Sequence, residues 1–227
     1  MLQLVIGNKN YSSWSMRPWV LMRHFGIAFD EIKLRFDFTP GSAYYRELAR
    51  YTPAGRVPVL LIDGFAVWDT LAIVEALADT HPRLALWPRD AMQRARARSL
   101  AAEMHAGFSA LRDLCPMNIE AELLQVGARL FGAEVALQRD LARIDSLWTE
   151  QLAASGGPFL FGEYGAVDAY YAPVAARVRG YALPVSASAR GYVERLWASP
   201  GVAAWVADAM AERDFLDFEE PYRQRPA

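Results

Sequence analysis

The chain has 227 residues, of which 53% are hydrophobic and 22% charged, and its formal net charge is −2. This composition excludes an intrinsically disordered chain, and the small net charge excludes a general attraction to nucleic acid or anionic membranes. The single cysteine, Cys115, excludes an internal disulfide and any metal site built from several cysteines. Since we see neither a secretory leader nor an apolar run of membrane-spanning length, we expect a cytoplasmic protein without a membrane partner.

Four segments near the N-terminus have the hydrophobic patterns of β-strands. Residues 2–7 form a short apolar run, which is typical of a strand covered on both faces, and residues 31–36 alternate polar and apolar side chains. The runs 57–62 and 65–68 are joined by Asp63-Gly64, a pair that favours the positive φ angles of a two-residue hairpin turn. We therefore predict a sheet that ends in a hairpin.

Helices are expected between and after these strands. One ends near Phe25, a second covers Ala43–Arg50, and a third covers Thr70–Thr80, where Leu71, Val74 and Leu77 share one face. The predicted order of the first part of the chain is therefore βαβαββα, a mixed α/β unit.

The strand patterns disappear after residue 88. Residues 92–114 and 133–154 are predicted to be long helices, and Ser155-Gly156-Gly157-Pro158 ends the second of them. Further helices are expected at 166–180, 190–198 and 201–213. The polar tail beyond Glu219 is predicted to be poorly ordered. The chain thus divides into an α/β domain, residues 1–82, and an all-helical domain, residues 88–227.

Three serines, Ser12, Ser13 and Ser15, lie between the first strand and the first helix. Since Pro18 has no N–H and fits best in the first turn of a helix, we place the N-cap near Ser15. A helix N-terminus favours an anion, so Ser12 or Ser13 is a candidate to donate its hydroxyl hydrogen to a thiolate. The alternative is that all three are loop and capping residues. No G-x-S-x-G turn surrounds them, which argues against a serine hydrolase.

Two further segments each allow both a structural and a functional interpretation. Pro58 either simply opens a strand or, as a cis proline, turns the backbone of Val57 toward a ligand. Asp69 or Thr70 caps the helix that follows, and the same helix end is suited to a ligand carboxylate at Thr70 and a ligand ammonium at Asp69.

In this order and spacing, the serines, Val57-Pro58 and Asp69-Thr70 before Leu-Ala-Ile resemble the glutathione transferase superfamily. The likeness spans nearly the whole chain and is closest to the serine-type, zeta-like bacterial group. Residues 12–17 are similar to the Ser-Ser-Cys segment of the zeta class, with Trp14 in place of cysteine, and Asp69-Thr70 replaces the usual Glu/Gln-Ser. Gly165 and Asp168 resemble the capped helix of the second domain, which is a folding element.

The resemblance implies a thioredoxin-like N-terminal domain that binds glutathione, a helical-bundle C-terminal domain that completes a hydrophobic substrate site, and a homodimer without a metal. Glutathione's sulfur would face Ser12 or Ser13, with Ser12 preferred from the zeta pattern. The residues implied to bind the rest of glutathione are Arg17, Arg56, Val57, Pro58, Asp69 and Thr70. The residues suggested for the substrate side are His105, Arg112, Met117 and Asn118.

The implied activity is conjugation of the glutathione thiolate to a small hydrophobic electrophile. Two alternatives stay open: glutathione-dependent cis–trans isomerisation of a maleylacetoacetate-type dienoic acid, and a non-catalytic binding or regulatory role. Cys115 precedes Pro116 at an expected helix end and is predicted to be a buried, unreactive thiol. No sequence feature identifies the electrophile.

Overall fold

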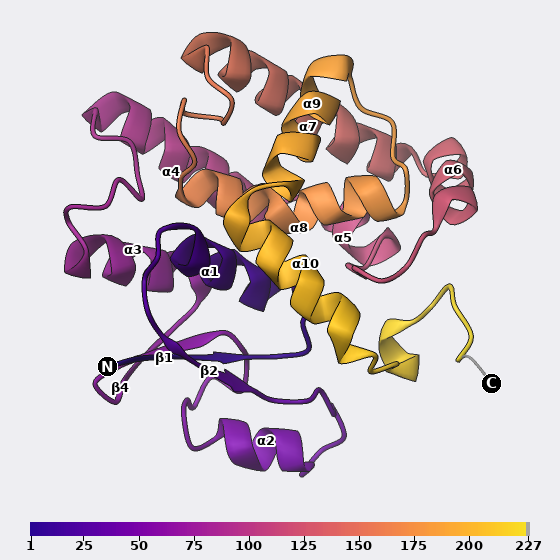
Figure 1. Cartoon of the computed structure of the whole chain (residues 1–227). Coiled ribbons are helices and arrows are strands. Elements are labelled where there is room, and N and C mark those ends of the chain that lie inside the picture. The colour runs from indigo at the N-terminus through magenta and orange to yellow at the C-terminus, as the bar shows by residue number, and fades with distance from the viewer. Residues whose placement is uncertain (226–227) are drawn as a thin grey trace.

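The computed structural model describes residues 1–225 and places four strands in one sheet, in the order β2-β1-β3-β4 (Figure 1). Strand β1 (Leu2–Ile6) pairs in parallel with β2 (Asp30–Lys33) and antiparallel with β3 (Val59–Ile62). Strand β4 (Phe65–Trp68) returns antiparallel to β3. Both residues of the connecting turn, Asp63 and Gly64, have positive φ, at 49° and 84°. The predicted hairpin is therefore present.

The sheet carries helices on both faces (Figure 1). Helices α1 (Ser13–His24) and α3 (Thr70–Thr80) cover one face, and α2 (Ala43–Leu48) covers the other. Successive side chains of β1 point to opposite faces of the sheet. Leu4 and Ile6 pack into the hydrophobic cluster that contains α1 and α3, whereas Val5 packs into the cluster that contains Leu48 of α2. The predicted order βαβαββα is confirmed, and the chain then continues into an all-helical part.

Within residues 1–225, the regular elements of the second part of the chain are helices, and two isolated β-bridges lie in the loop at residues 159–163. Its helices are α4 (Ala91–Ala106), α5 (Ser109–Leu114), α6 (Leu124–Ala133), α7 (Val135–Ser155), α8 (Ala166–Gly180), α9 (Ala187–Trp197) and α10 (Pro200–Glu212). Helix α8 is buried over nearly its whole length, and both α8 and α10 pack against α1. Gly201 permits the contact with α1, since a Cβ atom there would lie 2.1 Å from the carbonyl oxygen of Val20.

Two helix predictions need correction, and one helix is additional. Residues 92–114 form two helices because Gly107 and Phe108 interrupt them, Phe108 with φ of 54°. Helix α6 was not predicted. Helix α1 begins at Ser13 with Ser12 as N-cap, so the N-cap expected near Ser15 is wrong, and Pro18 lies inside the helix. Proline there removes one backbone hydrogen bond, a cost that the burial of Pro18 and the residues around it offsets.

The C-terminal tail is ordered where the structure describes it. A 3₁₀ turn, η1 (Asp217–Glu219), is followed by Glu220, whose side chain is buried against the N-terminal part of the chain. The prediction of poor order is therefore wrong for residues 220–225, and residues 226–227 lie outside the described part. Within residues 1–225, no helix combines the length and apolar character needed to cross a membrane.

Candidate functional site

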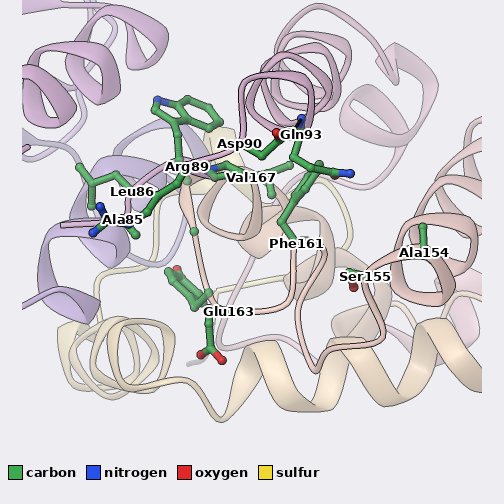
Figure 2. A pocket seen from close by; sticks show the side chains of 15 residues that line it. Ala85, Leu86, Arg89, Asp90, Gln93, Ala154, Ser155, Phe161, Glu163 and Val167 are labelled. Carbon is green, nitrogen blue, oxygen red and sulfur yellow. Dashed lines mark hydrogen bonds between the residues drawn. The ribbon is translucent and has the colours of Figure 1, made fainter. Parts of the chain in front are cut away.

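A cleft of 940 Å³ lies where the sheet, α1 and α3 meet the helical part of the chain. Ten of the residues singled out from the sequence line it: Ser12, Ser13, Arg56, Val57, Pro58, Asp69, Thr70, His105, Arg112 and Met117. A second cavity, of 470 Å³, lies between residues 85–93 and 154–167 and contains none of them (Figure 2). The larger cleft is therefore the candidate site.

The N-terminus of α1 brings serine hydroxyls and free backbone N–H groups to one wall of the cleft. Ser12 is the N-cap residue, and its backbone carbonyl accepts a hydrogen bond from the Met16 N–H. Its side chain does not cap the helix; its hydroxyl is instead hydrogen-bonded to that of Ser15, with 2.7 Å between the oxygens. Within residues 1–225, no acceptor pairs with the N–H groups of Trp14 and Ser15 or with the half-buried Ser13 hydroxyl. This helix end is suited to an anion.

The segment before β3 presents open backbone to the same cleft. The Val57–Pro58 peptide bond is cis, one of the two states that the sequence left open. Neither the N–H nor the C=O of Val57 takes part in a backbone hydrogen bond with another described residue outside the sheet ladder, which begins at Val59. An extended peptide in the cleft could therefore pair with Val57 as with an additional strand.

The N-terminus of α3 supplies a carboxylate and a hydroxyl. Asp69 is the N-cap, and its Oδ1 accepts a 2.8 Å hydrogen bond from the Leu71 N–H. Its φ of 71° is in the left-handed region, a conformation that costs free energy for a non-glycine residue and that occurs often at functional sites. Thr70 is fully buried, and its Oγ1 lies 3.4 Å from Nδ1 of His105, whose Nε2 lies 3.4 Å from Asp69 Oδ2.

Arg17 lies behind this helix end rather than in the lining of the cleft. It is 1% exposed, its guanidinium stacks 4.0 Å from the Trp14 ring centroid, and its Nη1 lies 3.5 Å from Thr70 Oγ1. Its Nε has no hydrogen-bond partner in residues 1–225. Burial, with further contributions from neighbouring arginines, lowers the pKa of Arg17 to about 9. Arg17 is therefore a buried cation next to Thr70, and the hydrogen-bonding capacity of its Nε is not satisfied within residues 1–225.

Two more arginines face the cleft from the helical side. Arg112 donates hydrogen bonds to the carbonyls of His105 and Gly107, and its guanidinium lies 5.0 Å from the Trp14 ring centroid. Arg177 on α8, which the sequence did not single out, donates from Nε to the Cys115 carbonyl at 2.8 Å. Burial first, and the charge of Arg112 second, lower the pKa of Arg177 to about 10. Within residues 1–225, neither arginine forms an ion pair with a carboxylate.

Asn118 does not reach the cleft. Its Nδ2 donates a 2.9 Å hydrogen bond to Glu220, so this residue fixes the C-terminal tail. The tail in turn brings Glu219 to the lining of the cleft, where burial and the neighbouring Glu220 raise its pKa to about 7. Only tertiary structure reveals Glu219 and Arg177 as site residues, because nothing in their local sequence distinguishes them.

Cys115 is fully buried, as predicted, and burial raises the pKa of its thiol to about 12, which disfavours the reactive thiolate. Within the described residues, no group of three or more His, Cys, Asp or Glu side chains is arranged to hold a metal ion.

Residues 11–80 match the family model of the glutathione S-transferase N-terminal domain. The chain is 34% identical over 126 residues to a probable maleylacetoacetate isomerase of Caenorhabditis elegans, which covers 56% of this chain and 55% of that protein. It is 26% identical over 172 residues to maleylacetoacetate isomerase of Rattus norvegicus, covering 74% of each chain. The chain thus spans about half the length of the first curated relatives it matches.

In fold, the chain is similar to the crystal structure of a glutathione transferase homolog from Burkholderia with bound glutathione. The TM-score is 0.71 at 23% sequence identity, over 92% of this chain and 98% of that one. A second structure of similar fold, Ure2p in complex with glutathione, gives a TM-score of 0.68 at 14% identity, over 89% of this chain and 96% of that one.

Proposed function

We propose that this chain, which belongs to the glutathione transferase superfamily, binds glutathione in the 940 Å³ cleft and uses its thiolate as a nucleophile. One observation carries the proposal. The serine-bearing N-terminus of α1, the open backbone of Val57 and the N-terminus of α3 with Asp69 all face the same cleft. These groups match, in order, a thiolate, a peptide backbone and an amino-acid end.

Each part of glutathione has a partner of matching chemistry in this arrangement. The γ-glutamyl carboxylate accepts from Thr70 at the positive end of α3, with the Arg17 cation behind it, and the γ-glutamyl ammonium pairs with the Asp69 carboxylate. The cysteinyl backbone pairs with Val57 next to Pro58. Arg56 lies beside this segment and is available to the glycine carboxylate.

The sulfur then lies at the N-terminus of α1. A hydroxyl hydrogen from Ser12 or Ser13 and the free N–H groups of the helix stabilise the thiolate and lower the pKa of the thiol. A decrease of about two units corresponds to roughly 2.7 kcal/mol, which is within the range of one charge-assisted hydrogen bond plus a helix N-terminus. No general base is required.

The acceptor enters from the helical side, and that side is not purely hydrophobic. Met117 and Trp14 offer apolar surface, whereas Arg112 and Arg177 bring positive charge without a protein counter-ion in residues 1–225. This charge favours the second candidate function, isomerisation of an unsaturated acid. The thiolate adds to the conjugated double bond, the resulting single bond rotates, and elimination restores both the double bond and glutathione. The acceptor's carboxylate would pair with the guanidinium groups.

We also propose the two-domain division at residues 82–88, a cytoplasmic location and a homodimer. Exposed apolar side chains support an interface with a second copy: Phe65 on β4 is 73% exposed and Met92 on α4 is 77% exposed. Sedimentation of the purified chain tests the assembly, and a monomer at micromolar concentration would contradict it.

Titration calorimetry with glutathione, followed by turnover assays, tests the proposed function. We expect binding, and then either loss of one thiol per product with an aromatic halide acceptor or isomerisation of a maleylacetoacetate-type acid without net loss of thiol. Binding without turnover of either substrate class would leave the non-catalytic role. No binding at millimolar glutathione would exclude all three.

A further inference from the structure

Ser15 lies one helical turn after Ser12 and outside the lining of the cleft. It is fully buried, and its Oγ accepts a 3.2 Å hydrogen bond from the backbone N–H of Gly7, the residue that follows β1. The same oxygen is 2.7 Å from the Ser12 hydroxyl oxygen. Ser15 thus connects the end of the central strand to the serine that faces the cleft.

The available partners of Ser15 determine the direction of its hydrogen bond with Ser12. A hydroxyl has one hydrogen to donate, and its rotation is free to choose the acceptor. Apart from the Ser12 oxygen, no acceptor in residues 1–225 is hydrogen-bonded to Ser15 Oγ. If Ser12 donated to Ser15, the buried Ser15 hydrogen would be left without a partner, which costs about 1–3 kcal/mol. Donation from Ser15 to Ser12 satisfies both groups and leaves the Ser12 hydrogen free.

We propose that Ser15 is a positioning residue that donates its hydroxyl hydrogen to Ser12 and thereby directs the Ser12 hydroxyl hydrogen at the glutathione sulfur. The inference rests on the proposed function. It deepens that function by choosing between the two adjacent serines: Ser12 is held by a second hydroxyl, whereas Ser13 has no hydrogen-bond partner for its side chain in residues 1–225.

The local geometry of α1 supports this assignment independently. A serine at an N-cap usually accepts a backbone N–H from the first turn, but the Ser12 side chain does not. Its bond to Ser15 keeps it away from the N–H groups of Trp14 and Ser15, which remain available to an anion. Hydrogen bonds in a chain polarise one another, so the link from Gly7 through Ser15 makes the Ser12 hydroxyl a better donor.

The experiment titrates the thiol of glutathione bound to the 227-residue chain by the ultraviolet absorbance of the thiolate. Ser15→Ala removes the link, and Ser15→Cys keeps a side chain of similar size with a weaker donor. Ser12→Ala and the double variant Ser12→Ala/Ser15→Ala complete a cycle. Ser199→Ala is the matched control, since Ser199 is also buried, with its hydroxyl bonded to the Leu196 carbonyl, but immediately precedes α10 and lies outside the cleft lining.

We expect Ser15→Ala to raise the pKa of the bound thiol by about one unit, which corresponds to a roughly threefold loss of thiolate at pH 7 when the wild-type thiol titrates about two units below its free value. Ser15→Cys should give a smaller increase, and Ser199→Ala none. In the Ser12→Ala background, Ser15→Ala should add almost nothing, because the link then has nothing to position. A purely structural role of Ser15 would instead give equal effects in both backgrounds, and this result would overturn the proposal.

The outcomes separate the inference from the proposed function. If the wild-type protein binds glutathione with a lowered thiol pKa and Ser15→Ala leaves that pKa unchanged, the positioning role fails and the function stands. If the wild-type protein does not lower the thiol pKa, the proposed function fails and the positioning role with it. Should Ser15→Ala not fold, the thiol pKa in Ser15→Cys decides, and no increase there overturns the proposal.

Discussion

The Tyr11 hydroxyl donates a 2.7 Å hydrogen bond to the carboxylate of Glu220, although the two residues are separated by almost the whole chain. Tyr11 immediately precedes Ser12, so this bond anchors the C-terminal tail to the residue before the candidate site. The Leu216 N–H donates to the same hydroxyl oxygen at 3.3 Å. Burial and the bond to Glu220 raise the pKa of Tyr11 to about 12, so the hydroxyl stays protonated as a donor. The bond therefore holds in place the tail segment that contributes Glu219 to the lining of the cleft.

Tyr11→Phe should loosen the tail. Removing the donor to a charged acceptor is expected to lower the free energy of unfolding by about 1–2 kcal/mol and to increase hydrogen exchange in residues 216–223. Urea unfolding and exchange mass spectrometry measure the two effects. Tyr51→Phe is the control, because the Tyr51 hydroxyl has no hydrogen-bond partner in residues 1–225. Unchanged exchange of the tail in Tyr11→Phe would contradict this account.

Ser12→Ala and Ser13→Ala should differ in their effect on the bound thiol. Ser12 is oriented by Ser15, so its loss should raise the thiol pKa by about two units, whereas the loss of Ser13 should change it by less than half a unit. Conjugation rates at pH 6.5 should fall in proportion to the thiolate. Equal shifts in the two variants would show that the sulfur is shared between the serines, and a larger shift for Ser13→Ala would reverse the assignment.

Asp69→Asn should separate ligand binding from helix capping. Asparagine caps a helix about as well as aspartate, so the stability of α3 should change little. The loss of the negative charge should weaken glutathione binding about 10–100-fold, since the γ-glutamyl ammonium loses its partner. Asp90→Asn is the matched control, because Asp90 caps α4 through the N–H groups of Met92 and Gln93. Calorimetry should show unchanged affinity in the control, and an equal loss in both variants would refute the role of Asp69.

Arg17→Met should cost affinity rather than stability. Burial of the guanidinium costs desolvation energy, and its stacking on the Trp14 ring offsets part of that cost. The two effects are opposed, so the free energy of unfolding should change by less than about 1 kcal/mol in the variant. Glutathione affinity should fall about tenfold or more, because the cation behind Thr70 is lost. Arg83→Met, at an exposed residue of the linker, serves as control. A large loss of stability with unchanged affinity would make Arg17 a structural residue.

Much of the fold follows from local sequence. The sheet was predictable because its strands alternate or form apolar runs, and because Asp63-Gly64 adopts the turn that it favours. Helices α3 and α8 were predicted with their observed bounds, since Asp69 and Gly165 mark their starts clearly. The residues from the three N-terminal segments meet in one cleft, as the resemblance implied.

The errors arise where tertiary contacts override local preference. Pro18 was expected in the first turn, but packing of α1 against α8 and α10 holds a longer helix around it. The polar tail was expected to be poorly ordered because its partners, Tyr11 and Asn118, are more than a hundred residues away. Arg177 was overlooked because it occurs in an alanine-rich helix, and its importance depends on burial next to the cleft.

The stability of the helical part should depend on pH through Asp168. This carboxyl is fully buried beneath the start of α8, where it accepts hydrogen bonds from the N–H of Gly165 and the hydroxyl of Tyr192. Burial raises its pKa to about 6 despite these donors, from 3.8 in an unfolded chain. Between these two values the unfolded chain has released the proton and the folded chain still holds it, so stability falls as pH rises from 4 to 6.

Asp168→Asn tests this pH dependence, because asparagine has nearly the same size but does not titrate. The variant should be less stable than the wild type at both pH values, since one oxygen replaces two acceptors, but its deficit should shrink by about 2 kcal/mol between pH 4 and pH 7. Urea unfolding at the two pH values measures the change. Tyr192→Phe should move the titration to higher pH, because it removes a donor that favours the charged carboxylate. A deficit that is constant with pH would mean that Asp168 is ionised in the folded chain throughout this range.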